Sequence, residues 1–521
     1  MNRRKFLSHS ALALSTGPLV LNAATRFPEK RPSCNYRIVY NDDSQTLQRV
    51  SGIQQLLEKG VDRFVGTHVD ALFWSIGEAD VYYFRTRTAE MHGENVKQFR
   101  SAASLRLIRG LESVLKERED YFQAMADRCR QIGIQFFVSV RMNDAHDSPK
   151  GWNNPDLYSQ FKRAHPELLL GDAVHPSFAT GFDFFYEKVR QNKFKVIEEI
   201  VQDYDLDGIE LDFLRHPAFF KPDEAYRNRH LITQLVRRVR ALVDRASKSR
   251  GKPFRLAARV PFSFNIAFKL GLDVSTWIKE DLLDVVTAGT PRGHESDLSM
   301  QEYVEAIRGR DLTLLGQIGL YHPAEQTRAT ALNYWKQGVG GIYLFNWYAP
   351  LWDRKLWRKS LVEIGDPGLL KHRDKRYLID EQVSSLWQRS HPRAQLPVKI
   401  QQQSVGGPAR IRFFVGDDVR AATVEGKLVK AKLVLRLEQV MDDDDLQFRL
   451  NGVVLSREME DVQMEPTLFG SRNWLHLSFK ADILKTGFNQ LELVLNRRTA
   501  RLVVPLVLAQ MSVEIDYNDK G

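Results

Sequence analysis

The chain is poor in features that mark several common classes of protein. It has only two cysteines, Cys34 and Cys129, so one disulfide is the most that it can form and no cysteine-based metal site can be built. Cys129 lies in a helical pattern, where a buried thiol fits as well. No stretch beyond the N-terminus is long and apolar enough to cross a bilayer. No block of Lys or Arg and no zinc-finger, helix-turn-helix or RNA-binding signature is present, so nucleic acid is not an expected partner.

The overall composition of the chain is that of a globular protein. The hydrophobic fraction is 43% and the charged fraction 27%, which does not fit a disordered chain. With 521 residues the chain is too long for one ordinary core, so we expect two or three domains. The formal net charge of +10 favours an acidic partner, such as an anionic polysaccharide, unless the basic residues are merely scattered over the surface.

The N-terminus, "MNRRKFLSHSALALSTGPLVLNAA", resembles a twin-arginine export signal. Arg3 and Arg4 form the charged pair, a mild apolar stretch follows, and small residues stand at Ala23 and Ala24. We therefore expect residues 1–30 to be a signal peptide. Its removal would leave a periplasmic or secreted protein with no stable membrane span. An uncleaved N-terminal anchor is the alternative.

Residues 36–365 alternate between β-rich runs and amphipathic helical patterns. Eight runs predict strands, at 36–42, 69–74, 134–144, 207–213, 254–260, 283–290, 312–320 and 341–347. Such repeated alternation is what a (β/α)8 TIM barrel, an α/β fold, requires. An open doubly wound sheet is the alternative, but it would have a glycine-rich phosphate loop after an early strand, and none is present.

The pattern changes after the barrel. Residues 366–397 are expected to form a helical linker, and 398–521 contain short alternating runs separated by turn residues, which predict an all-β sandwich or jelly roll. Asn451 followed by glycine is a hairpin signal. The runs at 446–455 and 489–496 resemble strands of galactose-binding-type carbohydrate modules. The module either binds glycan or is purely structural.

The run "DGIELDF" (207–213) places two acids inside a predicted buried strand. With a period of two, Glu210 and Asp212 share the face that points into the barrel, about 6–7 Å apart. A buried carboxylate is costly unless it is paired, and the neighbouring strands supply Arg141 and Arg259. We expect Glu210, the deeper acid, to be mainly an ion-pair partner, and Asp212, nearer the C-terminal mouth, to be chemically exposed. The alternative is that all four form a structural plug.

The same stretch carries a family resemblance. "DLDGIELDFLRHP" resembles the "DGIxLDYxRxP" motif of the bacterial glycosyl-hydrolase-like (β/α)8 families, of the kind called glycosyl-hydrolase-like 10. "DVSTWIKEDLLDVVTAGT", with Trp277 and Asp284, resembles the sixth-strand region of these proteins. The resemblance covers roughly residues 36–365 and implies a sugar-active barrel in which Asp212 is the nucleophile or base.

A comparison with family 18 chitinases gives a contrast. Their motif, DxxDxDxE, ends in the glutamate that acts as the acid. The corresponding positions here are Asp207, Glu210, Asp212 and Leu214. Because leucine cannot donate a proton, the substrate-assisted chemistry of those chitinases is disfavoured.

Glycoside hydrolysis normally needs a second carboxyl group. The loop 290–297 supplies Glu295, which we prefer as the general acid because it could face Asp212 across the barrel mouth. Asp144, in the loop 143–148, is the second choice. Carboxyl groups about 5–5.5 Å apart would retain configuration, and about 6.5–9.5 Å apart would invert it. Either loop could instead be an ordinary solvated loop.

The run "NDAHD" also contains ligand types that zinc and similar ions accept. Without a second histidine pair beside it we expect no metal and no other cofactor. His216, a lone histidine after the motif strand, is expected to be hydrogen-bonded.

Sugar binding favours aromatic platforms for the apolar ring face and polar groups for the hydroxyls. The residues expected to contact substrate, all at predicted C-terminal strand ends or in the lumen, are Glu210, Arg141, Asn143, Arg215, Arg259, Trp74, Trp152, Tyr321, Asn346 and Trp347. The arginines, with the basic charge balance, favour a uronate or sulfated glycan.

Taken together, the sequence predicts an exported glycoside hydrolase that acts on a polysaccharide or oligosaccharide. One alternative is a non-catalytic carbohydrate-binding protein of the cell envelope. Another is a barrel enzyme of a different class, such as a metal-dependent deacetylase or a polysaccharide lyase. The sequence indicates neither the sugar nor the oligomeric state.

Overall fold

The computed structural model describes residues 35–291, 296–320, 322–348, 354–380, 395–402, 406–441, 443–455 and 472–518. The segment 1–30, predicted to be an export signal, lies outside these ranges. Among the helices in the described ranges, none has both the length and the apolar character needed to span a membrane.

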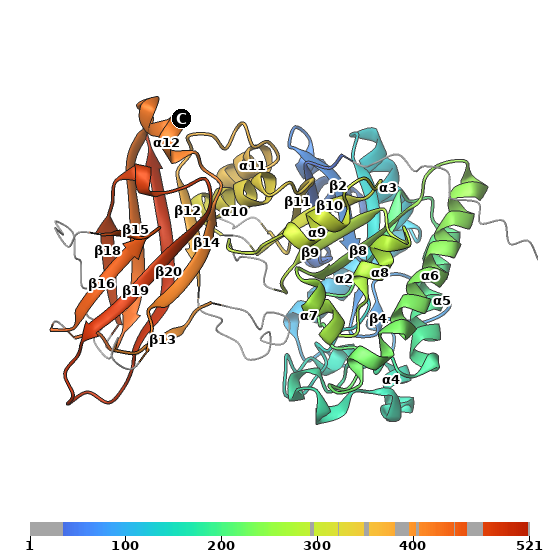
Figure 1. Ribbon diagram of the computed structural model, residues 1–521. Helices are drawn as coiled ribbons and strands as arrows, with labels where there is room; N and C mark the ends of the chain where they lie inside the picture. Colours follow the sequence, from blue (N-terminus) through green and yellow to red (C-terminus); the bar gives the residue numbers. More distant parts are fainter. Residues whose placement is uncertain are drawn as a thin grey trace, which may run out of the picture. The chain divides into compact units, whose positions relative to one another are not determined.

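Eight parallel strands close into a barrel, in the order β1-β11-β10-β9-β8-β7-β6-β2 (Figure 1). They are β1 (Ile38–Asp42), β2 (Val69–Ser75), β6 (Gln135–Arg141), β7 (Gly208–Asp212), β8 (Arg255–Pro261), β9 (Val285–Gly289), β10 (Thr313–Gly319) and β11 (Gly341–Phe345). Each strand overlaps one of the eight ranges expected from the sequence pattern. The predicted (β/α)8 barrel is therefore confirmed.

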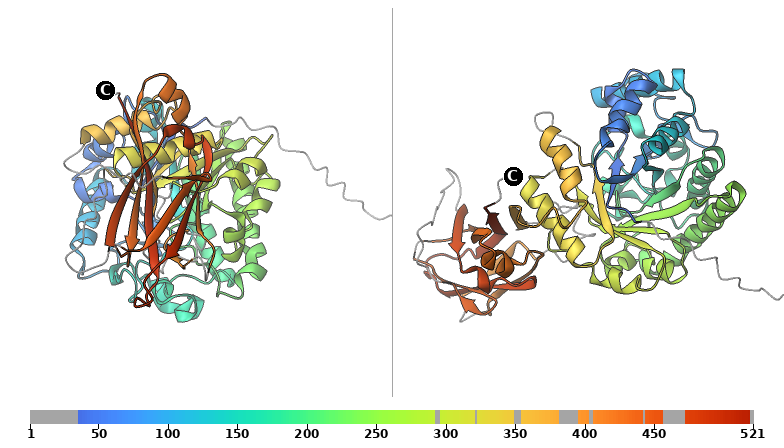
Figure 2. Two further views of the ribbon diagram at one scale, coloured as in Figure 1. Left: turned by 60° about the vertical axis from the view of Figure 1, so that its left-hand side comes forward. Right: turned by 90° about the horizontal axis from the view of Figure 1, so that it is seen from above.

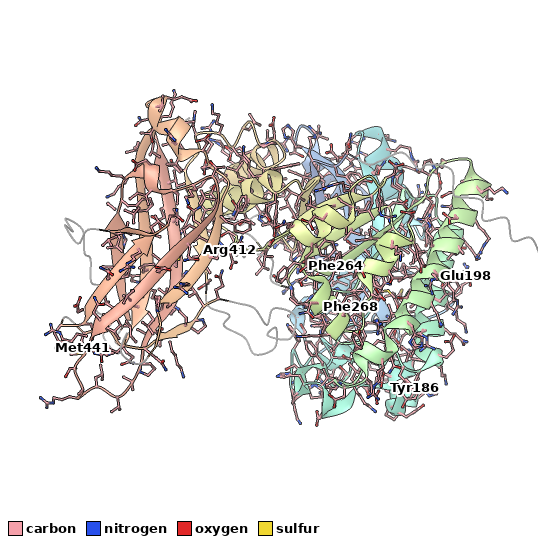
Figure 3. The ribbon with its side chains drawn as sticks, viewed as in Figure 1. Tyr186, Glu198, Phe264, Phe268, Arg412 and Met441 are labelled. Carbon is pink, nitrogen blue, oxygen red and sulfur yellow. The ribbon has the colours of Figure 1, made fainter. Side chains whose placement is uncertain are left out.

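Helices connect the strands, and the longer ones surround the barrel (Figure 2). They are α1 (Ile53–Gly60), α2 (Ala102–Glu117), α3 (Tyr121–Gln131), α4 (Gln160–Ala164), α5 (Glu187–Asp203), α6 (Ala225–Arg250), α7 (Phe264–Lys269), α8 (Val274–Lys279), α9 (Gln301–Ala306), α10 (Ala324–Lys336) and α11 (Arg354–Glu363). Figure 3 labels Glu198 on α5 and Phe264 on α7. The longest, α6, ends at Arg250 and is capped by Gly251, whose φ of 64° is a left-handed conformation that suits glycine. Short strands β3 (Gly77–Glu78), β4 (Val81–Tyr82) and β5 (Glu90–Met91) form a small sheet after β2.

The two faces of the barrel strands bury different side chains. On β7, Ile209 and Leu211 belong to the large core between the barrel and its helices. A separate apolar cluster fills the lumen, with Val39, Ala71, Phe73, Phe137, Ala257, Val285, Leu315, Tyr343 and Phe345. Nearer the C-terminal ends of the strands the lumen becomes polar, with Glu210, Asp212 and Arg259 all buried. This polar end is where β/α barrels place their active sites.

The C-terminal region forms two antiparallel sheets that share one apolar core, as the all-β prediction required. One sheet has β12 (Lys375–Ile379), β20 (Leu506–Tyr517), β15 (Leu428–Glu438) and β18 (Arg472–Ser478), with β13 (Val398–Ile400) also paired to β20. The other has β14 (Ala409–Val415), β19 (Gly487–Arg497), β16 (Asp445–Leu450) and β17 (Val453–Val454). A short helix, α12 (Val419–Val424), follows β14. Asn451 and Gly452 join β16 to β17 with φ values of 53° and 85°, which confirms the predicted hairpin.

One part of the expected domain layout is wrong. The stretch 366–397 was expected to be a helical linker, yet it contains β12, which pairs antiparallel with β20. The sandwich therefore takes a strand from before the predicted boundary. The alternating pattern of that strand, Lys375 to Ile379, is too short to stand out from the polar sequence around it.

Candidate active site

Asp212, the last residue of β7, is held by three donors. Its Oδ2 accepts a hydrogen bond of 2.7 Å from Nη1 of Arg259. Its Oδ1 accepts from the backbone N–H groups of Leu214 at 2.9 Å and Arg215 at 3.2 Å. The carboxylate faces the lumen as the sequence predicts, but only 2% of its side chain is exposed. Asp212 is thus a buried, oriented ion-pair partner, which corrects the expectation of a chemically exposed acid.

Glu210, one layer deeper, has no arginine partner among the described residues. Its Oε2 accepts hydrogen bonds from Oγ of Ser139 at 2.5 Å and from the hydroxyl of Tyr343 at 2.9 Å. Burial, with the nearby charge of Asp212, raises the pKa of Glu210 to about 8. Its carboxyl group is therefore protonated at neutral pH.

Both acids are buried, but the ion-paired one is Asp212 and not Glu210 as expected, and the register of β8 explains why. On β8, the residue paired with Asp212 is Arg259, whereas the residue paired with Glu210 is Ala257. Arg259 consequently reaches the acid at the mouth and not the deeper one.

Arg259 is itself fixed by the lumen wall. Its Nε donates to Oε1 of Gln317 at 2.7 Å, and its guanidinium lies 3.7 Å from the ring centroid of Phe345. Gln317 in turn donates to the carbonyl of Thr290 at 2.7 Å. Because Arg259 is buried and committed to Asp212, it positions the acid, and the expectation that it contacts substrate is not supported.

Arg141, at the end of β6, gathers three carboxylates. Its guanidinium pairs with Asp144 at 2.7 Å, with Glu78 at 3.4 Å and with Asp43. Although burial opposes a charge here, Asp43, Asp144 and Glu78 raise the pKa of Arg141 further above its usual range. The expectation that Arg141 contacts substrate is likewise not supported, since its guanidinium is buried and ion-paired with acids of the protein.

Asp144 does not fit the role of general acid that was its second-choice assignment. Its Oδ1 accepts from the backbone N–H of His146 at 2.9 Å and lies 2.6 Å from Nδ1 of that ring, while Oδ2 pairs with Arg141. Burial alone would raise the pKa of Asp144, but His146, His216 and Arg141 hold it well below its usual range. A carboxylate in this state does not donate a proton at neutral pH.

Two histidines complete this cluster. The guanidinium of Arg215 contacts Nε2 of His146 at 2.6 Å and Nε2 of His216 at 3.2 Å. Because a guanidinium only donates, Nε2 of His146 must accept, and its Nδ1 carries the proton toward Asp144. Burial lowers the pKa of His216 well below its usual value, so that ring is neutral.

Asp144, His146 and His216 offer one carboxylate oxygen and two ring nitrogens within 4.8 Å of one another, a set that could hold a divalent ion. In metal sites the outer ring N–H of each histidine usually donates to a carboxylate, a carbonyl or water. Here the outer nitrogens of both rings face Arg215, which is itself a donor. The three residues therefore fit a hydrogen-bonded network better than a metal site.

A pocket of about 240 Å³ opens beside this cluster, with Glu78, Arg100, His146, Trp152 and Asn154 among its lining residues. Trp152 is 39% exposed. Its ring centroid lies 5.0 Å from that of His146 and 4.6 Å from that of His216, and the guanidinium carbon of Arg215 lies 5.4 Å from it. Of the three tryptophans proposed to contact substrate, Trp152 is the one placed at a pocket.

The other two tryptophans are core residues, which corrects their assignment as substrate platforms. Trp74 and Trp347 are both fully buried in the core outside the barrel strands. On β2 the alternation turns Phe73 into the lumen and Trp74 toward the helices. Trp347 lies against Trp357 of α11, with ring centroids 6.3 Å apart.

Asn143 is likewise a structural residue. Its Nδ2 donates to the carbonyls of Phe182 at 2.8 Å and Ala218 at 2.5 Å, and its Oδ1 accepts from the N–H of Phe182 at 2.9 Å. With both ends of its amide used to tie loops together, it has no capacity left for substrate. Asn346, half-buried after β11 with a φ of 51°, stays a prediction.

Two of the predicted residues, Glu295 and Tyr321, lie outside the described residues, so their roles stay predictions. The sequence reasoning also missed residues that the structure brings to the site. They are Asp43, Glu78, Arg100, Gln317 and Tyr343. Asp43 follows β1 directly, which was the available signal, whereas Glu78 ends the short strand β3 after β2.

No family model and no curated protein matches the chain. Among solved structures, it is similar to the family 36 α-galactosidase AgaB of Geobacillus stearothermophilus (12% identity, 89% of this chain, 55% of the other, TM-score 0.35). It is also similar to a family 18 N-acetylglucosaminidase of Paenibacillus barengoltzii (12% identity, 63% of this chain, 99% of the other, TM-score 0.37). A third similar structure is a family 20 exo-β-N-acetylglucosaminidase of Vibrio harveyi (11% identity, 63% of this chain, 54% of the other, TM-score 0.33). The chain spans about half the length of the α-galactosidase. With TM-scores this low, the matches do not establish a shared activity, and the resemblance to the glycosyl-hydrolase-like 10 family stays a prediction.

Proposed function

We propose that this protein is a glycoside hydrolase whose reaction takes place at the C-terminal mouth of the barrel. The observation that carries the proposal is Asp212. It ends a barrel strand, and Arg259 and two backbone N–H groups fix both of its oxygens. Orientation of this kind is what a nucleophile or base needs, because the reacting atoms must be held in place.

The state of Glu210 supports this reading. Two carboxylates on one strand would repel each other, and the protonation of Glu210 removes that repulsion. Asp212 can then carry the negative charge of the pair alone. Environments that separate two acids in this way are typical of sites that use carboxylate chemistry.

The second carboxyl group is proposed to be Glu295, in the loop after β9. In this scheme it protonates the glycosidic oxygen as the bond from that oxygen to the anomeric carbon breaks. Asp212 either forms a bond to the anomeric carbon or takes a proton from the attacking water. Hydrolysis then consumes one water and leaves two shorter sugars.

Release of reducing ends from a broad panel of glycans tests the proposal. Wild-type protein should cleave at least one, and Asp212→Asn and Glu295→Gln should each lower the rate at least about a hundredfold, the scale of acid–base contributions. Asp482→Asn, at an exposed position of the sandwich, is the matched control and should not change the rate. Glycan binding without any release would instead identify a non-catalytic carbohydrate-binding protein.

The substrate is further proposed to be anionic. Two of the mouth arginines, Arg141 and Arg259, are committed to acids. The net charge of +10 and Arg215, which has no carboxylate within ion-pair distance among the described residues, favour an anionic substrate. Cleavage of neutral glycans alone would contradict this part of the proposal and leave hydrolysis itself intact.

Export is proposed from the twin-arginine segment. The protein recovered from the periplasm or medium should lack the signal peptide predicted within residues 1–30, and Arg3→Lys together with Arg4→Lys should hold the precursor in the cytoplasm. N-terminal sequencing of the two fractions checks this, and an intact N-terminus outside the cytoplasm would oppose it.

A further inference from the structure

The pocket beside Trp152 has the size of a site for one sugar ring. Its volume of about 240 Å³ is below the roughly 300–1,000 Å³ of sites for drug-sized ligands. Its wall combines the partly exposed indole of Trp152 with the side chains of Asn153, Asn154 and Ser101. An aromatic face for apolar C–H groups and amides for hydroxyls are the contacts that a pyranose ring uses.

At this pocket, among the described residues, Oδ1 of Asn154 lacks a donor, and two arginine groups lack an acceptor. Arg100 is exposed, and its guanidinium has no hydrogen bond or ion pair to any residue in the described part of the chain. Behind Trp152, Nε of Arg215 is buried and likewise has no partner there. A buried donor without an acceptor is costly, so an acceptor supplied by a ligand would be favourable.

The acid that lines the pocket is ion-paired. Glu78 pairs with Arg141, whose guanidinium also contacts Asp43 and Asp144 behind the pocket. Arg100 also lines the pocket, and its charge has no ion pair in the described part of the chain. A carboxylate or sulfate, which accepts hydrogen bonds and carries negative charge, complements it.

We propose that this pocket is a subsite for one acidic sugar residue, whose ring lies on Trp152 and whose carboxylate or sulfate group pairs with Arg100. The identification of the ligand as part of a substrate rests on the proposed function, whereas its binding does not.

Calorimetric titration tests the subsite. The ligands are a tetragalacturonate, a sulfated chondroitin tetrasaccharide and cellotetraose, and the protein is Asp212→Asn, with Glu295→Gln as a second background that leaves the Asp212–Arg259 pair intact. At least one acidic ligand should bind more tightly than cellotetraose and should weaken as salt is raised. The acidic ligand that binds better distinguishes a carboxylate from a sulfate.

Substitutions in these backgrounds then assign the contacts. Arg100→Gln should weaken the acidic ligand about tenfold and change cellotetraose less than about twofold, since a hydrogen bond to a charged group is worth about 1.5–3 kcal/mol. Trp152→Ala should weaken both kinds of ligand about tenfold. Arg245→Gln, at an exposed arginine of α6, is the matched control and should change neither. Equal effects of Arg100→Gln on acidic and neutral ligands, or binding of neutral ligands alone, would overturn the proposal.

Reducing-end release by wild-type protein separates this inference from the proposed function. If acidic ligands bind through Arg100 but no glycan is cleaved, the subsite stands and the hydrolase proposal fails. If glycans are cleaved and Arg100→Gln has no selective effect, the hydrolase proposal stands and the subsite fails.

Discussion

Single residues at the barrel mouth differ in protonation because each has a different set of neighbours. Glu210 is paired with hydroxyl groups and keeps its proton, whereas Asp144 is surrounded by a guanidinium and two imidazoles and gives its proton up. The sequence places both acids among polar neighbours, but it does not say which neighbour each one meets. Their different roles follow from contacts of about 3 Å, which only the packed structure defines.

Glu210 makes stability depend on pH. Its pKa of about 8 in the folded state lies above the value of about 4.3 expected for an unfolded chain, so the folded state binds the extra proton. The resulting contribution of Glu210 to the free energy of unfolding is complete below about pH 4. It is lost as pH rises toward 8, by up to about 1.4 kcal/mol per pH unit. Urea unfolding at several pH values should show that Glu210→Gln removes this slope. An unchanged slope in the variant would mean that Glu210 is ionised in the folded state.

Asp144 has the opposite dependence. The pKa of Asp144 is lower in the folded state than the value of about 3.9 expected for an unfolded chain. Asp144 therefore contributes to the free energy of unfolding at pH values above the unfolded pKa, and this contribution is lost as pH falls through the folded-state pKa. Asp144→Asn should destabilise the protein at pH 7 by about 3–5 kcal/mol, because it breaks a buried ion pair with Arg141. Thermal unfolding measures this, with Asp482→Asn as the exposed control. A cost as small as that of the control would show that the cluster does not depend on this charge.

At the scale of elements, strand alternation decides which tryptophans can meet a ligand. Trp74 is the second-last residue of β2 and points to the outer helices, while Trp152 stands in a loop beside the pocket. Position near a strand end therefore does not suffice to predict a platform. The direction of the side chain must be counted from the residues known to face the lumen, here Phe73.

Trp74 and Trp152 should consequently respond differently to truncation. Trp74→Ala removes a fully buried ring and should cost about 3–5 kcal/mol of stability without changing the affinity of the remaining folded protein for glycan. Trp152→Ala, at a partly exposed position, should cost less than about 1 kcal/mol. Denaturation midpoints and titrations on the same samples check both. A loss of glycan affinity in the folded Trp74 variant would instead show that Trp74 belongs to the binding site.

For the whole molecule, the sequence predicts the architecture better than the site. All eight barrel strands and the hairpin at Asn451 follow from local patterns of apolar residues and turns. Local patterns do not predict which ion pairs form, because the sequence alone allows Arg141 and Arg259 each to reach either acid of β7. Register places both arginines beside Asp212. The structure separates them because Arg141 pairs with Asp43 and Glu78, which the sequence pattern did not connect to the site.

The pairing of β12 with β20 has a practical consequence for anyone who excises the C-terminal module. A fragment that begins at Val398 leaves Met511–Ile515 of β20 without the neighbour that β12 supplies, and so bares a row of backbone N–H and C=O groups along a sheet margin. Such a fragment should self-associate at concentrations where one that begins before Lys375 sediments as a monomer. Analytical ultracentrifugation of the two fragments would decide between them, and equal behaviour would show that the margin tolerates the loss of its outer strand.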